Sequence, residues 1–177
     1  MASTSEPIHT ARLLLEKLSS GHAEEAAATF DDMELHEFTG GHPSTSVELR
    51  ERYSRLEGGS SPDGMQRWLN WMMRDVESGQ LVGTVQATIE GTAHIDAHAT
   101  IAWVVGLPFQ RRGFAIEGAR SMVARLEADG VVGLSAYIHP DHVASAAIAR
   151  ALGLTPTGEM VGGEIRWSGQ TGAVDPG

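Results

Sequence analysis

The segment at residues 110–115 constrains the fold of this chain more than any other part of its sequence. It reads Gln-Arg-Arg-Gly-Phe-Ala, follows an apolar strand-like run at residues 101–105, and opens a stretch with apolar residues at helical spacing. The first N–H groups of a helix have no partner within it, and the helix dipole adds partial positive charge there. Gly113 allows close approach of the backbone to a ligand, and Arg111 and Arg112 supply guanidinium groups suited to phosphate oxygens. The sequence therefore predicts a pyrophosphate-binding turn between a strand and a helix.

The spacing of this turn matches neither of the two common phosphate-binding motifs, G-x-x-x-x-G-K-[ST] and G-x-G-x-x-G. The string Q-x-x-G-x-A instead resembles the acetyl-coenzyme A signature [QR]-x-x-G-x-[GA] of the GNAT N-acetyltransferase superfamily. Residues 11–15 (Ala-Arg-Leu-Leu-Leu) and 140–145 (Pro-Asp-His-Val-Ala-Ser) resemble segments of its RimJ/RimL-type branch. In that branch the second segment usually reads P-[ED]-N-x-x-S, so His142 stands where Asn is common. The alternative reading is a surface turn with two solvated arginines.

Hydrophobic periodicity and turn residues predict the element order β, α, α, β, β, β, α, β, α, β, β. The strands are expected at residues 11–18, 66–76, 81–90, 100–105 and 131–138 and in a closing hairpin at 159–167. This is the order of the GNAT fold, which is α/β with a mixed central sheet of six to seven strands, a splayed parallel pair and about four flanking helices. We expect residues 1–167 to form a single domain and residues 168–177 to form a disordered tail.

Composition and charge exclude several classes of protein. The chain has no cysteine, which excludes disulfides, cysteine nucleophiles and thiolate metal sites. Its net charge of −10 argues against nucleic acid as a partner, because nucleic acid requires a basic surface. No apolar run reaches the roughly 18 residues of a membrane span, and the N-terminus does not follow the pattern of a signal peptide. We expect a cytoplasmic protein without membrane association, and the choice between monomer and homodimer stays open.

The resemblance implies that acetyl-CoA is a co-substrate and that its pantetheine arm lies between two splayed parallel strands, at residues 100–105 and 131–138. The residues that the resemblance places against acetyl-CoA are Trp103, Val104, Val105, Gln110, Arg111, Arg112, Gly113, Phe114, Ala115, His142 and Ser145. An amine then attacks the thioester directly. Such a reaction requires a base or water relay for the amine and a proton for the leaving thiolate.

The sequence offers more than one candidate for the proton donor and for the base. Many GNAT enzymes use a tyrosine on the last helix as the acid, but the matching position here is Ala149. The alternative in the RimL type is Ser145, which could instead be an ordinary serine in the first turn of a helix. Branch members often carry a glutamate base where this chain has Thr100. His98 titrates in the right range for a base, although it could equally belong to a polar hairpin tip.

Two further observations concern histidines. His139 ends the second splayed strand and could face the thioester as a catalytic residue, or could be a strand-end residue bonded to backbone. His94, Asp96 and His98 form an H-x-D-x-H pattern that could hold zinc. Because GNAT chemistry needs no metal, we expect none here.

In this superfamily the acceptor is selected by the first two helices, the loop between them and the last hairpin. Our candidates for substrate contacts are Glu37, Phe38, Trp71 and Glu164. The carboxylates could attract an amine or be solvated charges, and the tryptophan could be core. We therefore expect acetyl transfer to a primary amine of a small molecule. The alternatives are a protein N-terminal acetyltransferase of RimJ/RimL type and a non-catalytic acyl-CoA sensor, which Ala149 and Thr100 would suit.

Overall fold

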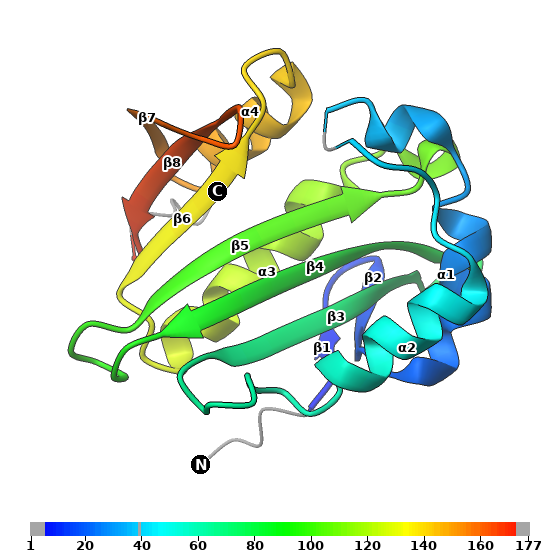
Figure 1. The fold of residues 1–177 in the computed structure, drawn as a ribbon, viewed down its shortest axis with the longest axis horizontal. Coiled ribbons are helices and arrows are strands. Elements are labelled where there is room, and N and C mark those ends of the chain that lie inside the picture. Colours follow the sequence, from blue (N-terminus) through cyan, green and yellow to red (C-terminus); the bar gives the residue numbers. More distant parts are fainter. Residues whose placement is uncertain (1–5, 39, 173–177) are drawn as a thin grey trace.

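The computed structural model describes residues 6–38 and 40–172, and these form one mixed sheet with helices on both faces (Figure 1). The strand order is β1-β2-β3-β4-β5-β6-β8-β7. The strands are β1 (Ile8–His9), β2 (Leu13–Lys17), β3 (Arg67–Asp75), β4 (Leu81–Glu90), β5 (His98–Val105), β6 (Gly133–Ile138), β7 (Thr155–Val161) and β8 (Glu164–Gln170). The α-helices are α1 (Ala23–Thr29), α2 (Ser46–Leu56), α3 (Phe114–Ala128) and α4 (Val143–Ala151). Three short 3-10 helices are η1 (Ser20–His22), η2 (Met33–His36) and η3 (Leu107–Phe109).

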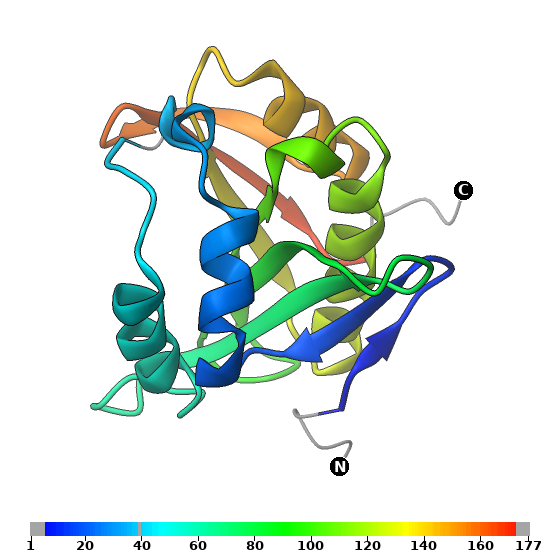
Figure 2. The same cartoon turned by 90° about the vertical axis from the view of Figure 1, so that its right-hand side faces the viewer.

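The helices divide the core into two parts (Figure 2). α3 crosses one face of the central strands, and α1 and α2 lie on the opposite face over β3 and the adjacent end of β4. The residues that α3 buries are Phe114, Gly118, Ala119, Met122, Val123 and Leu126. The second cluster, under α1 and α2, is Leu18, Ala23, Ala26, Leu49, Tyr53, Met72 and Leu81. The α1–α2 layer covers only part of its face, so the middle of β4 and β5 is left without a helix above it.

Local sequence explains two of these placements. Thr45 and Glu48 have the spacing of a capping box, and this box forms at the start of α2: the Thr45 N–H donates to Glu48 Oε2 at 2.7 Å, and the Glu48 N–H donates to Thr45 Oγ1 at 3.3 Å. α3 packs closely on the sheet because Gly118 carries no Cβ; an added Cβ would overlap the sulfur of Met73 on β3. None of the helices in the described part of the chain combines the length and apolarity needed to cross a membrane.

The central strands separate at one end. β5 pairs with β4 along its whole length but runs parallel to β6 only at His98–Thr100. Both strands continue past this point, and Figure 1 shows their ends diverging. At about 3.3 Å per residue, the part of β5 beyond Thr100 lines an opening about 17 Å long. The predicted splayed pair is therefore present.

The structure corrects the predicted sheet in two places. It has eight strands instead of six to seven, because Ile8 and His9 pair with Leu15 and Leu14 as an additional edge strand. β8 continues through Gln170, so residues 168–170 pair with β6 and do not belong to a disordered tail. The rest of that predicted tail beyond residue 172 lies outside the described residues. The end of β8, Ser-Gly-Gln, has no apolar residue, so the hydrophobic pattern did not predict that the strand continues to residue 170.

Candidate functional site

The turn between β5 and α3 has the backbone of an anion-binding loop. Gly113 caps α3 with φ of 81°, and Arg111 has φ of 61°, which is uncommon for a residue with a side chain. Left-handed residues at alternate positions produce the concave arrangement of N–H groups that binds anions, and here it adjoins the N-terminus of a 15-residue helix. The Gln110 side chain donates to the Val105 carbonyl at 3.1 Å, which ties the loop to the end of β5. The predicted pyrophosphate turn therefore has suitable backbone geometry.

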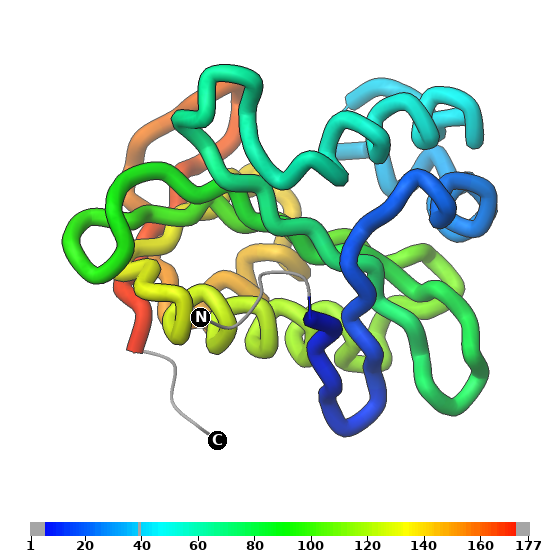
Figure 3. The backbone as a smooth tube through the Cα atoms, turned by 90° about the horizontal axis from the view of Figure 1, so that it is seen from below, coloured from blue at the N-terminus to red at the C-terminus, as the bar shows by residue number. Residues whose placement is uncertain are grey.

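Arg12 lies in the hairpin between β1 and β2 and bonds to this loop and to α3. Figure 3 shows that hairpin, in blue, beside the start of α3. Its Nη1 donates to the carbonyl of Arg112 at 2.8 Å, and its Nε donates to Glu117 Oε2 on α3 at 2.8 Å. Glu117 also accepts from the Thr10 hydroxyl at 2.6 Å and from the Arg12 N–H at 2.9 Å. These bonds to the carboxylate outweigh its partial desolvation and hold the pKa of Glu117 below its usual value. The loop is thus held by residues about one hundred positions earlier in the chain.

The Phe114 ring lies between two guanidinium groups. It is buried in the core, with the guanidinium carbon of Arg12 at 4.8 Å and that of Arg112 at 4.7 Å from its centre. Of the predicted cofactor contacts, Phe114 can therefore offer its backbone N–H and not its side chain. Arg111 and Arg112 are exposed, and Ala115 is half-buried against the core.

The open edge of β5 contributes the next group of predicted cofactor contacts. Beyond Thr100 no strand of the described chain pairs with this edge. Trp103 has a buried indole Nε1–H for which the described residues provide no acceptor. Buried donors are normally bonded, so an unbonded N–H at this place is unusual. Val104 is exposed and Val105 is buried at the end of the strand. An unpaired strand edge, an unbonded donor and an anion-binding loop together fit an extended molecule that ends in a phosphate.

The start of α4 brings His142 and Ser145 together. His142 is the N-cap residue, and its Nδ1 accepts from the Ser145 N–H at 3.3 Å. Its Nε2 also lies 3.3 Å from Ser145 Oγ. Ala149, one turn further along, is fully buried. Burial, with a smaller contribution from the nearby His139, lowers the pKa of His142, so its ring is neutral at neutral pH.

His139 and Phe38 lie beside this helix start. The Nδ1 of His139 accepts from the Asp141 N–H at 3.2 Å, so this nitrogen shapes the turn before α4. The ring of Phe38, which follows η2, is 4.5 Å from the ring of His142 and 5.3 Å from that of His139. Glu37 beside it is exposed. The loop between α1 and α2 therefore contacts the loop after β6, far from it in the sequence, and the predicted substrate contact Phe38 lies next to the predicted acid.

A second group of polar residues occupies the sheet face opposite α3, here called the open face. Side chains alternate along a strand, and directly paired residues share a face. The odd-numbered side chains of β4 and β5, such as Val85 and Ile101, are buried beneath α3. The polar side chains that point the other way include Asn70, Gln86, Thr88, Glu90, His98, Thr100, Ser135, Tyr137 and Arg166. Sequence analysis identified only His98 and Thr100 among them, and no sequence pattern linked these two residues to Ser135, Tyr137 or Arg166.

His98 lies where β5 and β6 are still paired. Its Nε2 is 2.7 Å from Ser135 Oγ, and Arg166 Nε donates to the same hydroxyl at 3.3 Å. Because a guanidinium can only donate, the hydroxyl can donate its own proton to His98 Nε2. Burial and then the charge of Arg166 lower the pKa of His98, which keeps its ring neutral. His98 is two residues from Thr100, about 7 Å along the strand.

The H-x-D-x-H pattern does not form one face of a strand, because β5 begins only at His98. The His94 N–H donates to the Gly130 carbonyl at 2.7 Å, and Asp96 Oδ1 accepts from the Thr92 N–H at 2.7 Å. His98 is bonded to Ser135 instead. In the described residues no group of three potential ligands has the arrangement of a metal site.

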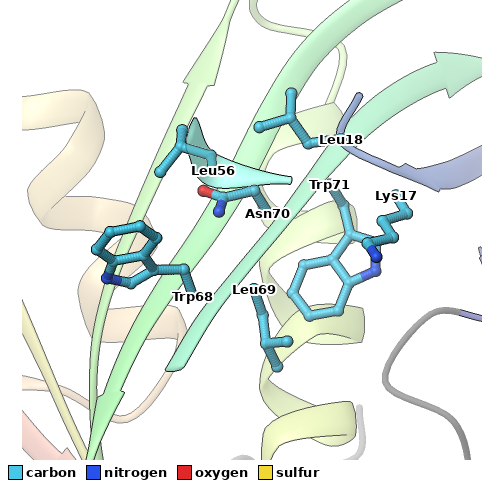
Figure 4. Close-up of a pocket in the computed structure, with 7 residues that line it drawn as sticks. All are labelled: Lys17, Leu18, Leu56, Trp68, Leu69, Asn70 and Trp71. Carbon is cyan, nitrogen blue, oxygen red and sulfur yellow. The ribbon is translucent and has the colours of Figure 1, made fainter. Parts of the chain in front are cut away.

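A small pocket lies on the open face where α2 meets β3 (Figure 4). Its lining residues are Lys17, Leu18, Leu56, Trp68, Leu69, Asn70 and Trp71. Trp68 and Asn70 point to the open face, whereas the side chain of Trp71 points to the other side of the strand and is 2% exposed. The prediction that Trp71 walls the acceptor site is therefore wrong for its side chain, which belongs to the core. Glu164 begins β8 at the far border of the open face.

Comparisons with known proteins agree with this architecture. Residues 12–155 match the family model described as Acetyltransferase (GNAT) domain. No curated protein matches the sequence significantly.

Three similar solved structures are an acetyltransferase (GNAT family) from Bacillus anthracis, RimJ from Mycobacterium smegmatis in complex with CoA-disulfide, and a ribosomal-protein-S5-alanine acetyltransferase from Vibrio fischeri. The first has a TM-score of 0.76 at 16% identity and covers 94% of this chain and 99% of its own. The second has a TM-score of 0.74 at 16% identity, covering 94% and 88%. The third has a TM-score of 0.71 at 16% identity, covering 97% and 100%. Because the family model spans most of the chain, the protein belongs to the GNAT acetyltransferase family.

Proposed function

We propose that this acetyltransferase uses acetyl-CoA to acetylate a primary amine of a small molecule. The observation that carries the proposal is the arrangement of the anion-binding loop directly after the unpaired edge of β5, with the buried Trp103 N–H beside it. GNAT enzymes use acetyl-CoA, and these features match its phosphate groups and its amide-containing arm. Acetyl-CoA would supply the acetyl group as a thioester in the opening between β5 and β6.

The open face supports an amine acceptor of modest size. Its centre, around Gln86 and Thr88, offers uncharged hydrogen-bonding groups. The pocket at Trp68 and Leu56 lies two strands from β5, which is about 10 Å at the usual strand spacing. A small molecule could therefore place its amine near Thr100 and an apolar group against this pocket.

The proposed roles of two residues follow from their neutral states and contacts. The acceptor nitrogen forms a C–N bond with the acetyl carbon, the C–S bond breaks, and the excess proton leaves the nitrogen. His98 takes that proton at Nε2 by way of a water molecule and the Ser135 hydroxyl, which lies 2.7 Å from Nε2, since the ring is neutral and about 7 Å from Thr100 along the strand. Ser145 donates its hydroxyl proton to the departing thiolate at the helix N-terminus, where negative charge is stabilised, and the serine oxygen regains a proton from solvent.

A second acceptor class is a protein N-terminal amine. It is favoured by the similarity to solved structures described as RimL, a ribosomal L7/L12 alpha-N-protein acetyltransferase, and as RimJ. The contact of Phe38 with His142 and His139 argues for the small molecule, because it places the α1–α2 loop against the start of α4 beside the acceptor entrance.

The test measures CoA release with a thiol-reactive dye. One panel contains small primary amines with and without apolar groups, and the other contains peptides with different N-terminal residues. We expect turnover with small amines and a loss of acetyl-CoA binding in an Arg111→Glu/Arg112→Glu variant, with Arg52→Glu/Arg55→Glu on α2 as the charge-matched control. Turnover confined to peptides would identify the second class. Binding without turnover of any amine would indicate a sensor and overturn the proposal.

A further inference from the structure

The most informative departure from the RimJ/RimL pattern is His142, because both nitrogens of its ring lie within hydrogen-bonding distance of Ser145. Nδ1 accepts from the Ser145 N–H, and Nε2 lies at hydrogen-bonding distance from Ser145 Oγ, each at 3.3 Å. The ring is half-buried, and its ring-to-ring contact with Phe38 at 4.5 Å restricts its rotation. The position of the histidine is thus fixed by three contacts.

These contacts determine where the protons lie. A nitrogen that accepts a hydrogen bond carries no proton, so the neutral ring must carry its proton on Nε2. Nε2–H then donates to Ser145 Oγ. Because the hydroxyl accepts from the ring, its own proton is free to point elsewhere. An asparagine could make the same pair of bonds with its oxygen and its amide N–H, but it could not be protonated.

We propose that His142 is a positioning residue that directs the Ser145 hydroxyl proton away from the ring and toward the leaving thiolate, and that this function is lost when the ring is protonated. The inference rests on the proposed role of Ser145. A protonated ring has no lone pair at Nδ1, so the bond from the Ser145 N–H breaks, and the added positive charge is unfavourable at a helix N-terminus.

The surroundings of the ring set the pH at which this change occurs. The titratable groups that face it are His139 on the loop after β6, Glu37 after η2, and the neighbouring Asp141, which lies 3.9 Å from His139 Nδ1. Burial and His139 lower the pKa of His142, whereas Glu37 opposes them. The net direction is downward, so the change falls on the acid side of the ordinary histidine range.

The experiment compares kcat of the wild type with that of His142→Asn, His142→Ala and Ser145→Ala from about pH 5 to about pH 8, with saturating acetyl-CoA and one amine. The informative quantity is the ratio of kcat for wild type to kcat for His142→Asn, because ionisation of the acceptor and of His98 cancels in it. We expect a ratio within about 3-fold of one at pH 7.5 that falls as the pH passes below the pKa of the ring and levels off at about one tenth of that value. At pH 7.5 His142→Ala should have a kcat about 10-fold below that of the wild type, and this difference should shrink as the wild-type ring becomes protonated.

Two results would overturn the inference: a ratio that does not change with pH, or a wild-type kcat in His142→Ala. Nitrogen-15 NMR of the histidine rings gives an independent readout, since it must show Nδ1 of His142 without a proton in neutral solution; a proton there also refutes the proposal. Failure of the proposed function can be distinguished from failure of this inference about His142. An enzyme whose kcat is unaffected by Ser145→Ala refutes the acid role of the serine, even where NMR finds the expected tautomer.

Discussion

Arg12 provides the sharpest test of how the phosphate loop is organised. Its guanidinium holds the Arg112 carbonyl on one side and Glu117 on the other, so Arg12→Ala removes both of these contacts to the loop and to α3. A hydrogen bond from a charged donor contributes about 1.5–3 kcal/mol. The Arg12 side chain is 47% exposed, so solvent screening reduces this to about 1–2 kcal/mol. If that free energy orders the loop, its loss should weaken acetyl-CoA binding about 5- to 30-fold.

The assay is isothermal titration of acetyl-CoA into wild type, Arg12→Ala, Arg12→Lys and Arg50→Ala. Lysine keeps the charge near Glu117 but cannot bridge both partners, so its Kd should be intermediate. Arg50 forms an exposed ion pair with Glu24 on the α1–α2 layer and serves as the matched control, with no expected change in Kd. An Arg12→Ala protein that is folded by circular dichroism and binds with the wild-type Kd would refute the reasoning.

Three further perturbations address other parts of the molecule. Trp103→Phe removes the unbonded N–H and should raise the Kd for acetyl-CoA about 5- to 10-fold by calorimetry; an unchanged Kd would show that this donor does not contact the ligand. Gly118→Ala forces a Cβ into the sulfur of a core methionine and should lower the free energy of unfolding by about 1–3 kcal/mol in urea titrations. Arg74 lowers the pKa of Glu16 and of Glu25 below their ordinary 4.5. Their stabilisation is therefore present above about pH 4.5 and is lost as pH falls through the lower folded pKa values, and Arg74→Gln should flatten this decline in urea titrations at successive pH values.

What the sequence predicted well depends on short-range patterns. The turn at residues 110–115 and the capping box at Thr45 involve residues within a few positions of one another, and both are present. The contacts that the sequence did not predict join segments that lie far apart in the chain. The bond from Arg12 to Glu117 spans 105 positions, and nothing in either local pattern pairs them. In the sequence Ser135 is one polar residue within an apolar strand, and only the parallel pairing of β5 with β6 brings it beside His98.

The same distinction explains why a local sequence motif identifies the predicted acid but not the predicted base. Ser145 belongs to a helix start whose local sequence sets its cap, and the structure adds a second bond from the same histidine. The base has no such local motif: Thr100 offers no carboxylate, and the nearest side chain on its strand face with a neutral nitrogen is His98. Both histidines are kept neutral by burial and by nearby cations or histidines. A site that must deprotonate an amine and protonate a thiolate gains from this, because neither ring then adds a positive charge that would repel an incoming ammonium ion.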